Sequence, residues 1–276
     1  MKKIIFNQEL SKYCNVHNNE LIKSSEQMIG YCLDLNSRTP DEYRWRFFSK
    51  DFFCEKISKL SDPKEINTIY WSDQNENINA YAMMTLWRGV ELIKSCLFGL
   101  NAKETIAPAI AARSLLELSS VFLLNADQIK KTFNNIQFSN ETVVFSTDIE
   151  EMVVKMIWGT RYGNPDPHLK QTNIMSFLNK VAKHPSAKDL IATYEFLCDI
   201  AHPSFIGNTS YWSYIESIND DGSEQRVMSR LPTRNTNTEI LDKTIWSLAW
   251  SSFCIRNAFV MMTNASETLM QRIINS

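Results

Sequence analysis

The sequence is poor in the residues that interrupt helices. Its 276 residues include only 7 glycines and 8 prolines, and these two residue types are the strongest breakers of a helical hydrogen-bond ladder. Leu, Ile, Met, Ala, Glu and Lys, which favour helices, are plentiful. The length suits one large globular domain, or a core domain with an N-terminal extension. The composition therefore predicts a mostly helical globular protein.

No charge of either sign dominates the chain. It has 29 Lys and Arg against 31 Asp and Glu, a formal net charge of −2. This balance argues against a global basic field of the kind that drives non-specific binding of nucleic acid. A local basic groove is still allowed.

Paired cysteines and long apolar runs are also absent. No two of the six cysteines form a Cys-x-x-Cys pair, so we expect reduced thiols, a cytoplasmic protein, no metal site and no other cofactor. The apolar run after the two N-terminal lysines has three residues, too few for a signal peptide. The most apolar later segment, 245–263, contains Arg256 and several polar residues. We therefore expect a buried core helix there and no membrane association.

Start signals divide the chain into expected helices. A cap residue, a proline and acids occur together at Thr39 and again at Asp62, predicting helices over 39–60 and from 63 onward. Further helices are expected over 75–99, 105–126, 147–159, 173–183, 190–202 and 238–274.

Three caps are expected at the starts of the later helices. Thr147 with Glu150 forms a capping box, as does Ser186 with Asp189. Thr172 is expected to cap the helix that follows it.

A change of pattern after His202 predicts a small β element. Aromatic and β-branched residues lie on both sides of Asp221-Gly222, which favours a short β-hairpin at about 209–231. The sequence therefore predicts an all-α bundle with a hairpin insertion. We expect an N-terminal helical extension over 1–72 and the bundle domain over 73–276.

Two charged residues, Arg113 and Glu117, stand alone in the apolar segment 105–126. They are four residues apart, so both project from one face of a helix. Burying two ionised groups costs several kcal/mol each unless they are paired and hydrogen-bonded. They are either a buried structural ion pair or the lining of a functional pocket that orients a third group.

The segment YEFLCDIAHPSF, residues 194–205, offers that third group. Glu195, Asp199 and His202 fall on one stripe of a helix, with Tyr194 beside it. A nearby carboxylate can fix the tautomer of an imidazole and raise its basicity. Pro203 favours an end of the helix at His202, where the helix dipole favours the protonated ring. His202 is suited to general acid–base chemistry and equally to a helix-end cap.

Four motifs carry a family resemblance. In order, AARSLLELSSVFLL, WGTRY, TNIMSFLNKVAK and YEFLCDIAHPSFIGNTSYW resemble an uncharacterised group of bacterial helical proteins with an Arg-x-x-x-Glu helix and a Tyr-x-x-Leu-(Ser/Cys)-(Glu/Asp)-x-x-His-Pro signature. The resemblance covers about residues 80–270. This group is similar to HEPN domains, helical bundles common in RNA-cleaving toxins and prokaryotic antiviral systems. The expected fold is thus an all-α, HEPN-like helical bundle.

The resemblance implies an RNA-targeting, ribonuclease-type effector in antiviral defence or a toxin system. His202 would be the general acid–base, Arg113 or Arg161 the phosphate clamp, and Tyr194 and Ser204 supporting groups. The expected partners are RNA or a nucleotide, a second copy of the chain, or a partner protein of a defence system. HEPN ribonucleases also place an arginine shortly before the histidine, whereas residues 195–198 here are Glu, Phe, Leu and Cys.

The alternative is a non-catalytic HEPN-like scaffold or sensor module. In it Arg113, Glu117, Tyr194 and His202 form a buried structural polar network. The near-neutral charge, the missing arginine and the acidic residues beside His202 favour this hypothesis, because carboxylates repel a phosphate.

Two lesser hypotheses use the same region. A small ligand or nucleotide would stack on Tyr211, Trp212 and Tyr214. A metal would bind Glu117 with the acids and histidine of residues 195–202, although the paired ligand motif of a helical metal site is missing.

Overall fold

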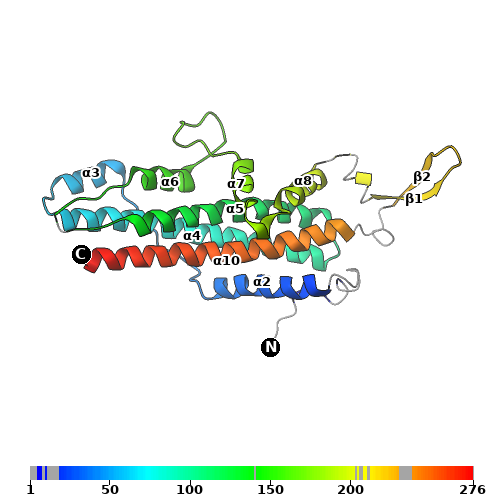
Figure 1. The fold of residues 1–276 in the computed structure, drawn as a ribbon, viewed down its shortest axis with the longest axis horizontal. Helices are drawn as coiled ribbons and strands as arrows, with labels where there is room; N and C mark the ends of the chain where they lie inside the picture. The colour runs from blue at the N-terminus through cyan, green and yellow to red at the C-terminus, as the bar shows by residue number, and fades with distance from the viewer. Residues whose placement is uncertain are drawn as a thin grey trace. The chain divides into compact units, whose positions relative to one another are not determined.

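The computed structural model describes residues 5–7, 10, 19–139, 141–202, 204, 208–209, 212–229 and 238–275. Within these residues the chain is mostly α-helical, with one two-stranded antiparallel sheet. The elements, shown in Figure 1, are α2 (Asn19–Ser37), α3 (Lys50–Ser58), α4 (Pro63–Asn101), α5 (Ile106–Asn135), α6 (Thr147–Trp158), α7 (Ile174–Val181), a 3-10 turn (Pro185–Ala187), α8 (Leu190–Ala201), β1 (Ser213–Ile218), β2 (Glu224–Met228) and α10 (Thr238–Asn275). The predicted all-α fold class is confirmed.

The chain divides into two compact units, each assembled from separated stretches of sequence. The first unit contains Met1–Leu35, Gly89–Ser120 and Leu178–Cys254, and the second contains Asn36–Arg88, Val121–Phe177 and Ile255–Ser276. The long helices α4, α5 and α10 each contribute one part to each unit. The predicted border between residues 1–72 and 73–276 falls inside α4, and as a domain assignment it stays a prediction.

Apolar stripes on the helices build the core of the first unit. On α2 the buried side chains Ile22, Ile29 and Cys32 recur at helical spacing. Other members of this core are Val90, Ile93, Leu97, Leu115, Leu116, Leu190, Leu197, Ile245 and Leu248. Gly99 allows the end of α4 to approach the start of α5, because a Cβ at this position would lie 2.6 Å from the Pro108 ring.

Aromatic rings dominate the core of the second unit. Tyr70 and Trp71 on α4 are almost fully buried, and Trp71 packs edge-on against Phe133 of α5 with ring centroids 5.9 Å apart. The loop after α5 closes over these rings, since the Trp71 Nε1 donates to the carbonyl of Val144 at 3.0 Å. Each buried polar group of these large rings thus has a partner, as stable burial requires.

The predicted helix over 39–60 is wrong in its first half. Residues 40–49, which we call the strap, have no regular secondary structure, and α3 begins only at Lys50. Thr39 closes the end of α2 instead, because its Oγ1 donates to the carbonyl of Asn36 at 2.7 Å.

Contacts with α4 account for the shape of the strap. Tyr43 Oη donates to the Glu76 carboxylate at 3.1 Å, and Trp45 Nε1 donates to Asn77 Oδ1 at 3.0 Å. These tertiary contacts outweigh the local start signal, as they commonly do for short helical patterns.

The other long-helix boundaries follow the sequence closely. α4 begins at Pro63 and α10 at Thr238, as predicted. The helix expected to start at residue 75 is not separate, because α4 continues through that position. α5 extends nine residues past the expected end at Ala126, to Asn135.

Three predicted caps are displaced. The α6 cap is Ser146, whose Oγ accepts from the backbone N–H of Ile149, and Thr147 is already helical. The α7 start is held by Asn173, whose Oδ1 accepts from the backbone of Met175 at 3.0 Å, and Thr172 takes no part in that bond.

Before α8 the predicted capping box of Ser186 and Asp189 is replaced by the 3-10 turn. Asp189 makes no side-chain cap bond.

The predicted hairpin over 209–231 is present. β1 and β2 pair in antiparallel register, with an irregularity between Ile215 and Ser217. The turn contains Gly222 at φ 82°, a conformation that glycine adopts without steric cost. Figure 1 shows the two strands extending away from the helices of the first unit, and most of their side chains are exposed.

Among the described residues, one helix, α5, is long and apolar enough to cross a membrane by length and composition. In its most apolar 18-residue window 44% is buried, which is compatible with a core helix of a soluble bundle. The segment 245–263 lies in α10, which does not meet the same criteria. The cytoplasmic location stays a prediction.

Candidate functional site

A polar cluster joins α5 to α8 in the first unit. Arg113 and Glu117 come from α5, Tyr194 and Cys198 come from α8, and we call these four residues the Arg113 cluster. In each pair the residues are four apart, so they lie on one face of their helix. Two helical faces therefore contribute two side chains each.

Hydrogen bonds connect all four members of the Arg113 cluster. The Arg113 Nη2 lies 3.1 Å from Glu117 Oε1 and donates to Tyr194 Oη at 3.2 Å. The Arg113 Nε donates to Cys198 Sγ at 3.0 Å. Tyr194 Oη in turn donates to Glu117 Oε1 at 2.7 Å. The guanidinium group is thus bonded to a carboxylate, a phenol and a thiol at once.

The cluster is half-buried. Tyr194 is 5% exposed, whereas the side chains of Arg113 and Glu117 are 28% and 31% exposed. The ion pair is therefore only partly buried, which lies between the two alternatives of a buried structural pair and the lining of a pocket. Water reaches one side of the pair, which weakens the interaction relative to a fully buried one.

The cluster stabilises one protonation state. Burial and then the hydrogen bond to Glu117 raise the pKa of Tyr194 above its ordinary value of 10.0, so the phenol stays neutral and donates. Burial opposes the charge of Arg113, but the bond to Cys198 and the attraction of Glu117 outweigh it and raise the Arg113 pKa. The result is a cation, a neutral phenol and a carboxylate that satisfy one another.

α8 presents its acidic residues away from the core. Its buried side chains are Leu190, Thr193, Tyr194, Leu197 and Ile200. Glu195 and Asp199 are exposed. No hydrogen bond or ion pair joins the carboxylate of Asp199 to His202 in the described structure, so the imidazole is not held by that acid.

His202 lies at the C-cap of α8, as predicted. Its backbone is extended at φ −90° and ψ 147°, and its N–H donates to the carbonyl of Cys198, which fits the residue before a proline. The side chain is exposed and makes no hydrogen bond to any described residue. It follows Cys198, the nearest member of the Arg113 cluster, by four positions, but no hydrogen bond or ion pair joins its ring to the cluster. The structure therefore leaves His202 outside the Arg113 cluster.

The remaining predicted site residues lie elsewhere. Arg161 belongs to the second unit, where its guanidinium donates to the backbone carbonyl of Thr172. Ser204 Oγ donates to the carbonyl of Asp199 at 3.1 Å. Tyr211 lies outside the described residues, while Trp212 and Tyr214 belong to the hairpin region. Three of the five predicted site residues, Arg113, Glu117 and Tyr194, are brought together.

Two other kinds of site, a metal site and a cleft, can be assessed in the described part of the chain. No group of three or more His, Cys, Asp or Glu side chains there is placed to hold a metal ion. A cleft of about 320 Å³ in the second unit is lined by Tyr81, Asn125, Glu151, Lys155, Gln171 and Phe177 among others. Two of its amides are already engaged, because Asn125 donates to Tyr81 Oη and Gln171 donates to the Lys155 carbonyl.

Cys198 is the cluster member that the sequence analysis did not assign. The signal was available, because Cys198 follows Tyr194 by four residues and must share its face. Only the pairing of α8 with α5 reveals which side chain it meets.

Comparison of the chain with protein-family models, with curated proteins and with solved structures finds no match.

Proposed function

We propose that the protein is a non-catalytic HEPN-like scaffold or sensor module, in which the Arg113 cluster holds α8 against α5. The observation that carries this proposal is the state of Arg113. Its guanidinium is paired with Glu117 and bonded to Tyr194 and Cys198. A side chain with three internal partners stabilises an interface between helices.

A phosphate clamp would need a different environment. Catalytic cations act by facing the charge that develops on the substrate, in a site arranged for that charge. A phosphate approaching Arg113 would have to compete with the Glu117 carboxylate and would meet the exposed acids Glu195 and Asp199 nearby on α8. Like charges there disfavour an RNA backbone.

The order of motifs and the helical fold support the HEPN-like part of the proposal. The Arg-x-x-x-Glu motif lies on α5, and the second motif, from Tyr194 to His202, covers the later part of α8 and its C-cap. The absence of arginine from residues 195–198 favours a member of this type without nuclease activity.

A second candidate is the ribonuclease itself, and the exposure of His202 favours it. An exposed imidazole at a helix end is free to approach a 2′-hydroxyl. In this hypothesis Arg113 leaves Glu117 when substrate binds.

One assay separates the two candidates. The purified full-length chain and its His202→Ala variant are incubated with a labelled single-stranded RNA, with and without divalent cations. The non-catalytic proposal expects no cleavage above the buffer control in either sample. Cleavage by the wild type that disappears in His202→Ala would instead establish the ribonuclease.

A further inference from the structure

The cleft of about 320 Å³ in the second unit has the size of a site for a small molecule. One side of it is a stripe of α6, because Asp148, Glu151, Met152, Lys155 and Met156 recur there at helical spacing. Residues of α4, α5 and the chain around the start of α7 complete the lining. All of these residues belong to the second unit, so the cleft is formed within that unit.

Two amides of the cleft use their nitrogens within the protein. The Gln171 Nε2 donates to the backbone carbonyl of Lys155 at 2.9 Å, and the Asn125 Nδ2 donates to Tyr81 Oη at 3.0 Å. A Cβ at Gly159 would collide with the Gln171 amide, so glycine is needed for this placement. Neither amide oxygen accepts a hydrogen bond from a described residue. Because an amide oxygen can only accept, both amides offer acceptors to a ligand.

The charged groups of the cleft have an excess of one negative charge. Its lining contains the carboxylates of Asp148 and Glu151 and the ammonium group of Lys155. The ion pairs of the described side chains lie elsewhere, so these three groups are open to a ligand. Two carboxylates with open amide oxygens attract a cationic donor and repel an anion. The donor set does not suit a metal ion, because no group of three metal-binding side chains occurs among the described residues.

The rest of the lining is largely apolar. Val121 of α5, Met152 and Met156 of α6 and Phe177 of α7 are half-buried in it, and we call these four residues the apolar wall. Methionine side chains adapt to the shape of a ligand and make favourable contacts with aromatic rings. A phenylalanine ring also packs well against another ring. The apolar wall therefore suits a flat aromatic group.

We propose that this cleft binds a small aromatic amine, in which a ring carries an ammonium group on a short alkyl chain. The ring packs on the apolar wall. The three N–H groups of the ammonium donate to the carboxylates of Asp148 and Glu151 and to the Gln171 Oε1. This proposal does not depend on the Arg113 cluster, because that cluster lies in the other unit and the cleft requires no reaction.

The test measures binding to the full-length chain by isothermal titration calorimetry at neutral pH. Four probes share an indole ring and differ in charge: tryptamine is a cation, 3-indolepropionate an anion, tryptophan a zwitterion, and 3-methylindole is neutral. Tryptamine should bind, and each of the other three should bind at least about tenfold more weakly, because they lack the cation or add a carboxylate that the cleft repels. Phenethylamine, a cation with a smaller ring, is measured as a second amine.

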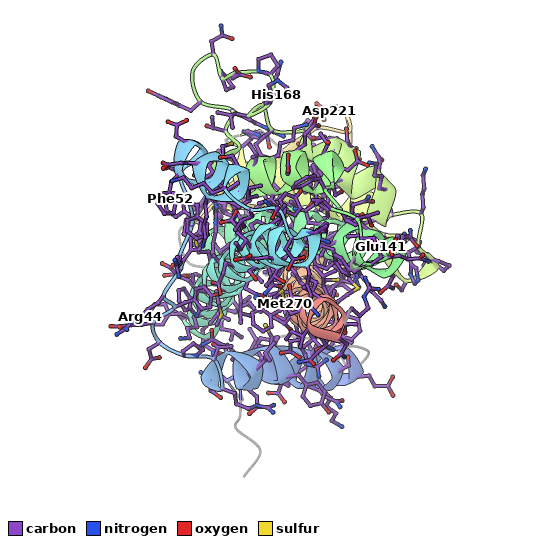
Figure 2. The ribbon with its side chains drawn as sticks, turned by 90° about the vertical axis from the view of Figure 1, so that its left-hand side faces the viewer. Arg44, Phe52, Glu141, His168, Asp221 and Met270 are labelled. Carbon is purple, nitrogen blue, oxygen red and sulfur yellow. The ribbon has the colours of Figure 1, made fainter. Side chains whose placement is uncertain are left out.

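Two substitutions on α6 should change the affinity for tryptamine in opposite directions. Glu151→Gln removes one carboxylate and should weaken binding by about tenfold. Lys155→Gln removes the opposing cation and should strengthen binding by about threefold. The matched control is Glu141→Gln, since Glu141 is an exposed acid of the same unit outside the cleft and is labelled in Figure 2. This variant should bind tryptamine as the wild type does.

Circular dichroism of every variant verifies folding. Absence of binding by both tryptamine and phenethylamine at millimolar concentration would overturn the proposal. So would binding of any of the other three indoles as tight as that of tryptamine, because the charge of the ligand would then not matter. Unchanged affinity of Glu151→Gln, or an equal loss in Glu141→Gln, would show that the amine does not bind in this cleft.

Discussion

At the scale of single residues, the sequence predicted the partners that are close along the chain. Arg113 and Glu117 are four residues apart, and their ion pair follows from helical spacing alone. The bonds from Arg113 to Tyr194 and Cys198 span 81 and 85 residues, and no local pattern determines such a pairing. His202 was expected to be the third group that Arg113 and Glu117 orient, but its side chain is exposed and makes no hydrogen bond to the cluster.

Tyr43 of the strap supplies a prediction about pH. Burial, the charge of Glu76 and the hydrogen bond to it raise the Tyr43 pKa from 10.0 to about 12. The pKa is higher in the folded than in the unfolded chain, so this stabilisation is complete below pH 10 and is lost as the pH rises through 12. Between pH 10 and 12 the Tm of the wild type should therefore fall more steeply than that of Tyr43→Phe. Parallel Tm curves, recorded by circular dichroism, would contradict the assigned environment of Tyr43.

At the scale of elements, the sequence predicted the helix starts and turns that are determined by a few adjacent residues. Proline after a cap residue started α4 at Pro63, and Asp221-Gly222 formed the turn of the hairpin. The same kind of signal failed at Thr39, because the rings of the strap find hydrogen-bond partners on α4. Those partners are 32 and 33 residues away, and burial of Tyr43 and Trp45 outweighs one local helix start.

The end of α5 supplies a prediction about a helix terminus. Arg272 of α10 donates from Nη2 to the carbonyls of Phe133, in the last turn of α5, and Ile136, just after it, both at 2.7 Å. The Phe133 carbonyl also accepts from the backbone N–H of Ile136 at 3.3 Å, so Arg272 holds the turn that ends α5. Arg272→Met keeps the apolar stem and removes the donors, and should cost about 1–3 kcal/mol of unfolding free energy. The adjacent exposed Gln271→Met should change it by less than about 0.5 kcal/mol. If urea unfolding gave equal changes in unfolding free energy for the two variants, the hydrogen bonds from Arg272 to these carbonyls would not contribute to stability.

At the scale of the whole molecule, composition was the best guide. Few glycines and prolines predicted a helical protein, and the structure is one. Composition does not predict how the chain divides, because the two units are each built from three separated stretches and share α4, α5 and α10. Such a division depends on long-range packing between helices. The order of the helices along the chain does not predict that packing.

The reactivity of the cysteine thiols tests the burial of side chains at several places in the fold. Cys32, Cys96 and Cys254 are buried and Cys54 is exposed, and burial raises the pKa of the Cys254 thiol to about 12. Cys14 lies outside the described residues and Cys198 is only partly buried, so both are replaced by serine. In this background Ellman's reagent at pH 8 should modify Cys54 rapidly. The three buried thiols should react only as fast as the protein opens. Persistence of the fast phase in Cys54→Ser at full amplitude would contradict the described burial.

The central claim is that Arg113 stabilises the fold and does not serve a reaction, and urea unfolding of two variants tests it most directly. Arg113→Ala leaves Glu117 and Tyr194 without their cation and should lower the unfolding free energy by about 1–3 kcal/mol, less than for a fully buried pair because water reaches one side. His202→Ala, at an exposed position, should lower it by less than about 0.5 kcal/mol. An Arg113→Ala protein as stable as the wild type would contradict the claim, and decisively so if that variant had also lost an RNA-cleaving activity present in the wild type.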